Sequence, residues 1–163
     1  MFLSTIIPYT ELSKELFFEL IKLRIEIFVV EQKCYYQELD EEDQIALHVV
    51  GQKNGIVIAA GRIIPDVSKM QVSIGRIAVK NGFRNNGYAR KMMDEILDYI
   101  GHNFKTYSIK LSAQVYLINF YNSFGFKEIG KVYLEDGIEH INMVKKWNGY
   151  FAYHFFLFSI VLP

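Results

Sequence analysis

The sequence predicts a mixed α/β domain with a twisted central sheet, antiparallel in its first half and with one parallel crossover, flanked by helices. Three observations favour this class. Apolar residues recur at helical spacing in several segments, short apolar runs lie between them, and glycine-containing turns separate neighbouring runs. With 163 residues and 51% hydrophobic content, the chain is long enough for one domain with a real core.

The first half is expected to contain a helix and a hairpin. Apolar residues recur on one face of residues 10–27, and Thr10 or Ser13 is expected to cap this helix. Two strands are expected over residues 47–52 and 56–64, because a Lys-Asn-Gly turn separates them.

An apolar strand, a glycine-containing loop and an amphipathic helix follow one another in the middle of the chain. The strand is expected over residues 74–79 and the loop over residues 80–87. An apolar stripe predicts the helix, and Gly101 is expected to end it. The stripe consists of Ala89, Met92, Met93, Ile96, Leu97 and Ile100.

The second half is expected to contribute three more strands and one helix. The strands are expected over residues 109–114, 127–133 and 138–145, and a Glu-Asp-Gly turn joins the last two. The helix is expected over residues 116–124, where apolar side chains share one face, and Gly125 is expected to end it.

The loop before the central helix is expected to bind an anion. A helix start leaves backbone N–H groups without partners at the positive end of the macrodipole. Gly87 allows close approach to the backbone, and Arg84 adds a permanent positive charge. The three spaced glycines of a dinucleotide site and the Gly-Lys-Ser/Thr of a triphosphate loop are both absent. An ordinary strand-to-helix turn is the other interpretation.

The wider pattern resembles a known enzyme family. Residues 84–89 (RNNGYA) resemble the R/Q-x-x-G-x-G/A signature of the GNAT N-acetyltransferases, and residues 119–126 (NFYNSFGF) resemble the segment that closes their acetyl-CoA site. Further segments are similar to the ElaA-like subfamily. They lie at residues 24–32, 36–40, 74–76, 112–114 and 133–143. We therefore expect a GNAT domain over residues 1–147, followed by an apolar tail of unknown role at 148–163.

The resemblance implies a GNAT fold and an enzyme that uses acetyl-CoA as co-substrate, with no metal. The implied reaction is direct transfer of the acetyl group to a primary amine in a ternary complex. The loop is expected to wrap the diphosphate, and the strand before it is expected to pair with the pantetheine amides. The loop residues are Arg84, Asn85, Asn86, Gly87, Tyr88 and Ala89, the strand residues are Ile77, Ala78 and Val79, and Asn119 is expected to touch the pantetheine arm.

Three residues are candidates for the chemistry. The match at Tyr121 implies a general acid that protonates the leaving CoA sulfur, although this tyrosine could also be only a core aromatic. Some family members carry a glutamate base on the central strand, but residues 72–79 contain no carboxylate and have Ser73 at that position. Glu31 and His48 are the alternative bases. Each also has a structural interpretation, Glu31 as a helix-end charge and His48 as a hydrogen-bonded strand histidine.

The sequence leaves the acceptor open. Arg62, Arg76 and Lys110 are available for an anionic acceptor such as glucosamine 6-phosphate, and Arg76 could instead pair with a structural carboxylate. A polyamine would favour the acidic stretch 38–43, which could otherwise be a solvated loop. Two alternatives from other classes are a non-catalytic acyl-CoA sensor on the same fold and a phosphate- or nucleotide-binding domain.

Composition indicates which classes of partner and which cellular compartment to expect. The 18 basic and 18 acidic residues give a net charge of +0, which argues against nucleic-acid binding. Cys34 is the only cysteine and no signal peptide is evident, so a cytoplasmic protein is expected. The histidines show no metal-ligand spacing. The apolar tail is shorter than the about 20 residues of a membrane span. It is expected to pack on the domain, with a homodimer contact or a membrane-surface anchor as alternatives.

Overall fold

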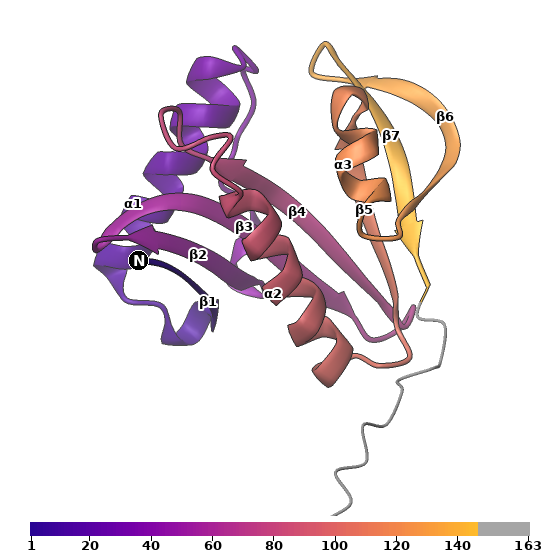
Figure 1. Cartoon of the computed structure of the whole chain (residues 1–163), viewed down its shortest axis with the longest axis horizontal. Coiled ribbons are helices and arrows are strands. Elements are labelled where there is room, and N and C mark those ends of the chain that lie inside the picture. The colour runs from indigo at the N-terminus through magenta and orange to yellow at the C-terminus, as the bar shows by residue number, and fades with distance from the viewer. Residues whose placement is uncertain (147–163) are drawn as a thin grey trace, which may run out of the picture.

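The described part of the chain folds around a single mixed sheet. The structure is a computed structural model that describes residues 1–146, so the expected apolar tail lies outside the described residues. The sheet has seven strands in the order β1-β2-β3-β4-β5-β7-β6. All neighbouring strands are antiparallel except β4 and β5, which are parallel (Figure 1). The expected mixed sheet with one parallel crossover is therefore confirmed.

The first four strands follow one another as antiparallel neighbours. They are β1 (Phe2–Pro8), β2 (Leu47–Lys53), β3 (Ile56–Asp66) and β4 (Gln71–Val79). The expected turn between β2 and β3 is present, and it has positive φ at Asn54 (53°) and Gly55 (79°). We expected no element before residue 10, but β1 pairs with β2 along its whole length. Its mostly half-buried residues lack the clear alternation that predicts a strand.

Two consecutive helical segments cover the first part of the chain. α1 (Lys14–Arg24) begins at Ser13, whose side chain accepts a hydrogen bond from the Leu16 N–H at 3.1 Å, so one of the two expected caps is confirmed. The helix then widens into the π-helical segment η2 (Ile25–Glu31), in which the Gln32 N–H donates to the Ile27 carbonyl at 3.1 Å. Such π turns are frequent at functional sites. Short 3₁₀ turns occur at η1 (Tyr9–Glu11) and η3 (Glu41–Gln44).

The central helix α2 (Tyr88–Asn103) carries the expected apolar stripe into the core. Met92, Met93, Ile96 and Ile100 are all fully buried. The expectation that Gly101 ends this helix is wrong, because the helix continues to Asn103 and Gly101 is buried within it. A glycine inside a helix costs only about 1 kcal/mol relative to alanine, and packing of the helix on the sheet outweighs that cost.

The second half supplies the remaining strands and a short helix. Its elements are β5 (Ser108–Gln114), η4 (Val115–Leu117), α3 (Ile118–Asn122), β6 (Lys127–Glu135) and β7 (Ile138–Lys145). The expected helix over residues 116–124 is therefore shorter and begins as a 3₁₀ turn. Gly125 follows it with a φ of 86°, as expected for a residue that ends a helix.

Helices cover both faces of the first half of the sheet. Val49 and Ala59 contribute to the core cluster that contains the α2 stripe, whereas the adjacent Val50 and Ala60 contribute to a second cluster with α1. Since successive strand residues point to opposite faces, α1 and α2 lie on opposite sides of the sheet.

The feature that positions the site is the divergence of β4 from β5. The two strands pair only at Gln71, Val72 and Ser73, opposite residues 108–110. Beyond this point they separate, as Figure 1 shows. The pairing of β3 with β4 also shifts register beyond Ala60, and Arg76 has a φ of 55°, which bends β4 at this point. The remainder of β4 therefore has an edge that no strand covers.

Candidate active site

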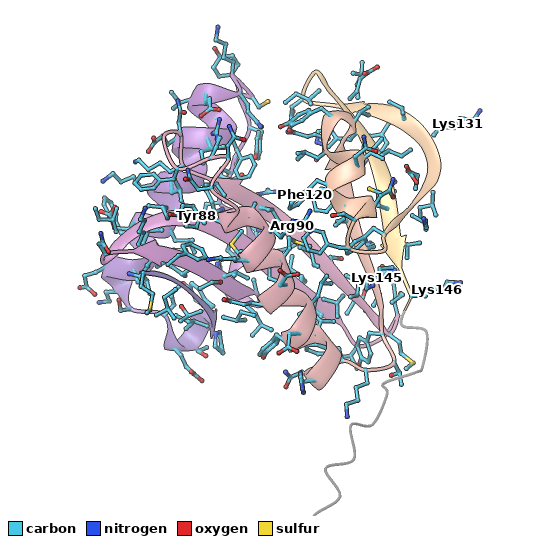
Figure 2. All side chains as sticks on the ribbon, in the orientation of Figure 1. Tyr88, Arg90, Phe120, Lys131, Lys145 and Lys146 are labelled. Atoms are coloured by element: carbon cyan, nitrogen blue, oxygen red, sulfur yellow. The ribbon has the colours of Figure 1, made fainter. Side chains whose placement is uncertain are left out.

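A cleft of about 980 Å³ lies where β4 and β5 diverge. Its walls come from β4, β5 and β7, from η2, from α3, and from the loop that leads into α2. Figure 2 shows Arg90 of α2 beside Phe120 of α3, and both residues line the cleft. Arg90 also donates to the Ser123 hydroxyl at 2.9 Å and lies over the Phe124 ring at 4.8 Å, so it links the two helices.

One end of the cleft is the N-terminus of α2. Gly87 is the N-cap residue, it has a φ of 75°, and no side chain caps the helix. The N–H groups of the first turn therefore have no intrahelical partner. Gly87, Tyr88 and Ala89 all line the cleft, so this helix start is open to the cavity.

The side chains of the preceding loop divide into two groups. Arg84 and Asn85 line the cleft. Asn86 is not among the lining residues, and its side-chain amide donates to the carbonyls of Phe83 at 3.2 Å and Arg84 at 2.8 Å. The side chain of Asn86 therefore stabilises the loop itself.

Arg84 is held by a carboxylate at the mouth of the cleft. Its Nη1 and Nη2 lie 2.6 Å and 2.8 Å from the two carboxylate oxygens of Glu31, and its Nε donates to the Val79 carbonyl at 2.9 Å. Both side chains are about two-fifths exposed, at 39% for Arg84 and 40% for Glu31. The hydrogen bonds from Arg84 lower the pKa of Glu31. Glu31 therefore lines the cleft, but as the partner of a guanidinium.

The uncovered edge of β4 forms one long wall. Ile77, Ala78 and Val79 line the cleft, and none of them pairs with β5. An uncovered edge presents N–H and C=O groups that an extended amide chain can pair with. Asn119 of α3, in contrast, is not among the lining residues.

Tyr121 lies on α3, is buried and lines the cleft. Its ring packs edge-on against Phe120 and Phe126, with centroids 5.1 Å and 6.1 Å away. It is thus both a core aromatic and a cleft residue. Burial raises the pKa of Tyr121 to about 12, so its hydroxyl keeps its proton at neutral pH.

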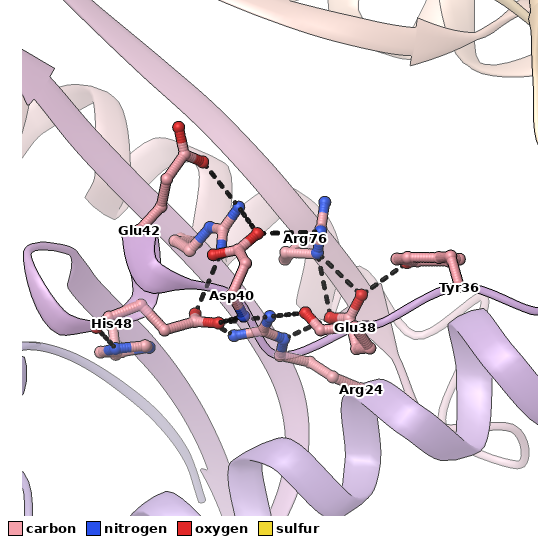
Figure 3. A network of polar contacts seen from close by, with 9 residues as sticks. Arg24, Tyr36, Glu38, Asp40, Glu42, His48 and Arg76 are labelled. Carbon is pink, nitrogen blue, oxygen red and sulfur yellow. Dashed lines mark hydrogen bonds and ion pairs between the residues drawn. The ribbon is translucent and has the colours of Figure 1, made fainter.

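A network of three arginines and four carboxylates supports the other end of the cleft (Figure 3). At its centre, the fully buried Arg24 donates to Glu38 and Asp43, each at 2.6 Å. Burial by itself would raise the pKa of Asp43, but the hydrogen bonds from Arg24 and from the Asp40 N–H, with the charges of Arg24 and Arg62, lower it to about 2. The acidic stretch 38–43 is therefore not simply a solvated loop, because Glu38 and Asp43 are buried and paired.

Both arginines expected to bind the acceptor line the cleft and belong to this network. Arg62 contacts Asp40 at 2.6 Å and Glu42 at 3.0 Å, and Arg76 contacts Glu38 at 2.9 Å. The structural pairing considered for Arg76 is therefore present. The charges of both side chains are largely offset by carboxylates.

His48 lies apart from the cleft. It is fully buried on β2, its Nε2 is 2.8 Å from the Asp43 carbonyl, and it is not among the cleft-lining residues. Burial lowers the pKa of His48. In the structure it supports the network instead of facing the cavity.

Comparison with known proteins identifies the family. The family model described as "Acetyltransferase (GNAT) domain" matches residues 13–147. The chain belongs to the GNAT acetyltransferase family. The chain is also similar to "Protein ElaA" of Escherichia coli K12, which is 37% identical over 141 residues that cover 85% of this chain and 92% of that protein. A UPF0039 protein of Schizosaccharomyces pombe is 42% identical over 132 residues, covering 80% of this chain and 87% of that protein.

Solved GNAT structures agree with the fold. The crystal structure of E. coli ElaA superposes with a TM-score of 0.85 at 35% identity, covering 90% of this chain and 100% of that one. An acyl-CoA N-acyltransferase from Pseudomonas aeruginosa gives a TM-score of 0.84 at 33% identity, covering 89% of this chain and 99% of that one. The expected GNAT fold and ElaA-like resemblance are thus confirmed, and the protein is an acyltransferase of a family whose fold binds acyl-CoA.

Several further side chains that line this GNAT cleft were not named as site candidates from the sequence. They are Cys34, Tyr36, Ser112, Gln114, His140 and Asn142. The alternation in β5 could have indicated the two residues from this strand, because Ile109, Leu111 and Ala113 enter the core and the intervening residues must point the other way. His140 and Asn142 of β7 pair with Gln114 and Ser112 of β5, a register that the sequence does not reveal.

Two further observations concern only residues 1–146. None of their helices has the length and apolar character needed to cross a membrane. They also contain no cluster of three or more histidine, cysteine or acidic side chains suited to hold a metal ion.

Proposed function

We propose that this GNAT protein is an acetyl-CoA-dependent N-acetyltransferase that moves an acetyl group directly to the primary amine of a small molecule. The observation that carries the proposal is that one cleft contains the uncapped start of α2, the uncovered edge of β4 and the hydroxyl-bearing ring of Tyr121. The start of α2 would bind the diphosphate of the co-substrate, the edge of β4 would bind its pantetheine amides, and Tyr121 would lie near its thioester sulfur.

Binding of acetyl-CoA draws on the first two features. Backbone N–H groups at the start of α2 and the charge of Arg84 would hold the diphosphate, and Gly87 leaves space for it because nothing lies within 4 Å of a Cβ built there. The pantetheine arm would extend along Ile77, Ala78 and Val79 and add a strand-like partner to β4.

The chemistry requires a neutral amine and a protonated leaving group. An alkylamine with a pKa near 10.4 is neutral in only about one molecule in a thousand at pH 7. Once the amine attacks the thioester, the C–S bond breaks and the departing sulfur needs a proton. Tyr121 is the proposed donor, since its hydroxyl lines the cleft and is protonated at neutral pH.

The acceptor would bind against the wall of the cleft that is formed by β5 and β7. Lys110 lies on this wall and is exposed, so an amino sugar phosphate such as glucosamine 6-phosphate is one acceptor that we propose. The pairing of Arg62 and Arg76 with carboxylates leaves less positive charge for a phosphate than the sequence suggested. A polyamine such as spermidine is therefore an equally important test compound.

The experiment is a turnover screen. Purified protein is incubated with acetyl-CoA and, in turn, spermidine, glucosamine 6-phosphate or a lysine-containing peptide, and free thiol and acetylated product are measured together. Propionyl-CoA and octanoyl-CoA in parallel reactions test whether acetyl is the preferred group. Amine-dependent thiol release with a matching acetylated product supports the proposal. Acetyl-CoA binding without amine-dependent turnover would favour the acyl-CoA sensor.

Replacement of Glu31 by glutamine tests whether this carboxylate restrains Arg84 or acts as the base. We expect Glu31→Gln to strengthen acetyl-CoA binding up to about fivefold, because an exposed ion pair is worth about 0.2–1 kcal/mol and its loss leaves Arg84 to the diphosphate. Titration calorimetry gives the Kd, and the kcat should stay near that of the wild type.

Glu26→Gln is the matched control. Glu26 lies in the same π-helical segment and pairs with Lys80 at 2.9 Å with similar exposure, but neither residue lines the cleft. This variant should leave the Kd for acetyl-CoA unchanged. A fall of about a hundredfold in kcat for Glu31→Gln, at constant Kd, would instead identify Glu31 as the base.

A further inference from the structure

His140 occupies a position in the cleft that the proposed mechanism has not yet used. It lies on β7 directly opposite Gln114, the last residue of β5, and is half-buried. Both residues line the cleft. The chain continues from Gln114 through η4 into α3, which carries Tyr121. The imidazole therefore lies on the acceptor wall, next to the segment that leads to the proposed acid.

The hydrogen bonding of this ring defines its tautomer. Nδ1 of His140 lies 2.9 Å from the Ile138 carbonyl oxygen. A carbonyl oxygen only accepts hydrogen bonds, so Nδ1 must carry the hydrogen. In the neutral imidazole the second nitrogen, Nε2, then has a lone pair and no proton. Among the described residues no hydrogen-bond partner occupies Nε2, so this lone pair is available to a ligand in the cleft.

The ring is also held in place from the side. It stacks on Tyr133 of β6 with centroids 6.1 Å apart and an interplanar angle of 27°. The Tyr133 hydroxyl is in turn 2.5 Å from the Ser112 hydroxyl and 3.5 Å from the Asn142 side-chain oxygen. A ring fixed by one hydrogen bond and one stacking contact keeps its lone pair in a constant direction, which favours proton transfer.

The other candidate bases are less suitable. Glu31 forms an ion pair with Arg84, and His48 lies outside the cleft. Strand β4 has Ser73 at the position where some family members have a carboxylate. Two more carboxylates line the cleft with partners of their own, since Glu42 pairs with Arg62 and Glu135 accepts from Ser112 at 3.3 Å. Asp136 also lines the cleft, but it is exposed in the turn between β6 and β7, outside the strands that carry His140 and Gln114.

We propose that Nε2 of His140 is the general base that removes a proton from the ammonium group of the acceptor. The role rests on the proposed N-acetyltransferase function. His140 takes one proton, and the neutral amine forms the C–N bond as the C–S bond breaks. Tyr121 gives its proton to the departing sulfur. The nitrogen then loses a second proton, which returns to Tyr121 through solvent. His140 finally releases its own proton to solvent. The sum is one amide, one thiol and one proton.

The first test is chemical rescue of His140→Ala. The assay uses the amine that the wild type acetylates among spermidine, glucosamine 6-phosphate and the lysine peptide. For this amine we expect the kcat/KM of the variant to be about a hundredfold or more below that of the wild type. The Kd for acetyl-CoA from calorimetry should stay unchanged. Added imidazole should restore part of the rate in a concentration-dependent way, because it can enter the space left by the side chain. His140→Gln, which fills that space without supplying a base, should be equally slow but should not respond to imidazole.

His102→Ala is the matched control. His102 of α2 has the same kind of contact, with Nδ1 2.8 Å from the Asp98 carbonyl, but it lies outside the cleft. This variant should keep the wild-type rate and show no response to imidazole. Wild-type turnover by a folded His140→Ala or His140→Gln variant would overturn the role of His140 and leave the proposed acetyltransfer intact.

A second measurement does not depend on any acceptor. Nitrogen NMR of the histidine rings in the wild-type protein should show the neutral His140 ring protonated at Nδ1, with Nε2 bare, and His140→Gln assigns the signal. A ring protonated at Nε2 would overturn the proposed base. Absence of turnover with every amine in the wild type would instead overturn the proposed function, whatever the tautomer.

Discussion

Gly87→Glu is expected to abolish acetyl-CoA binding, with a loss of at least about a hundredfold in affinity, equivalent to roughly 2.7 kcal/mol. Gly87 is the N-cap of α2 and lines the cleft beside Arg84. A carboxylate there would place negative charge where the diphosphate should sit, and it would satisfy the N–H groups that the phosphate oxygens need. Titration calorimetry with acetyl-CoA measures the effect directly.

The structure offers a close control for this substitution. Gly82 lies in the same loop, has a φ of 83° against 75° at Gly87, and likewise has nothing within 4 Å of an added Cβ. Gly82 does not line the cleft. Gly82→Glu therefore introduces the same backbone strain and the same negative charge as Gly87→Glu, but at a position away from the proposed ligand. This variant should bind acetyl-CoA nearly as well as the wild type.

Gly87→Ala separates strain from charge. It retains the unfavourable positive φ without adding a carboxylate, so it should weaken binding much less than glutamate does. If Gly87→Glu kept wild-type affinity while remaining folded, the diphosphate would have to bind elsewhere.

Tyr121→Phe is expected to lower kcat by about a hundredfold or more, with little change in acetyl-CoA affinity. The substitution removes only the hydroxyl, and the ring can keep its edge-on contacts with Phe120 and Phe126. Because the Tyr121 hydroxyl is protonated at neutral pH, we propose it as the acid, and its loss should leave the departing thiolate without a proton donor. Steady-state kinetics and calorimetry distinguish the two effects.

Tyr107→Phe serves as the control for removal of a tyrosine hydroxyl. Tyr107 also packs against the main core and lies 5.4 Å from the Phe104 ring, but it is outside the cleft. It should leave kcat unchanged. An unchanged kcat in Tyr121→Phe as well would restrict Tyr121 to its packing role.

Local patterns predicted most elements of the fold. The β2–β3 turn, the stripe of α2 and the glycine at the start of α2 depend on residues that are neighbours in sequence. The expectations that failed involve long-range packing. The edge strand β1 depends on pairing with residues 39 to 51 positions away, and Gly101 remains helical because α2 packs on the sheet.

The candidate site shows the same division. The sequence indicated Arg84 as an anion-binding charge, but not that Glu31, 53 residues earlier, holds it. It indicated an acidic stretch at residues 38–43, but not that Arg24 is buried beneath it. Both sets of ion pairs depend on which distant segments the tertiary fold brings side by side, and no local periodicity in the sequence reveals those neighbours.

The family, the mixed sheet and the glycine-containing loop that we propose for the diphosphate were all indicated by the sequence alone, because each depends on short contiguous motifs. The divergence of β4 and β5, the exclusion of His48 from the cleft and the orientation of His140 were decided only by the tertiary structure. These features depend on which distant strands become neighbours and in what register. A cleft is the space that such neighbours leave open, so its lining follows from the packed fold.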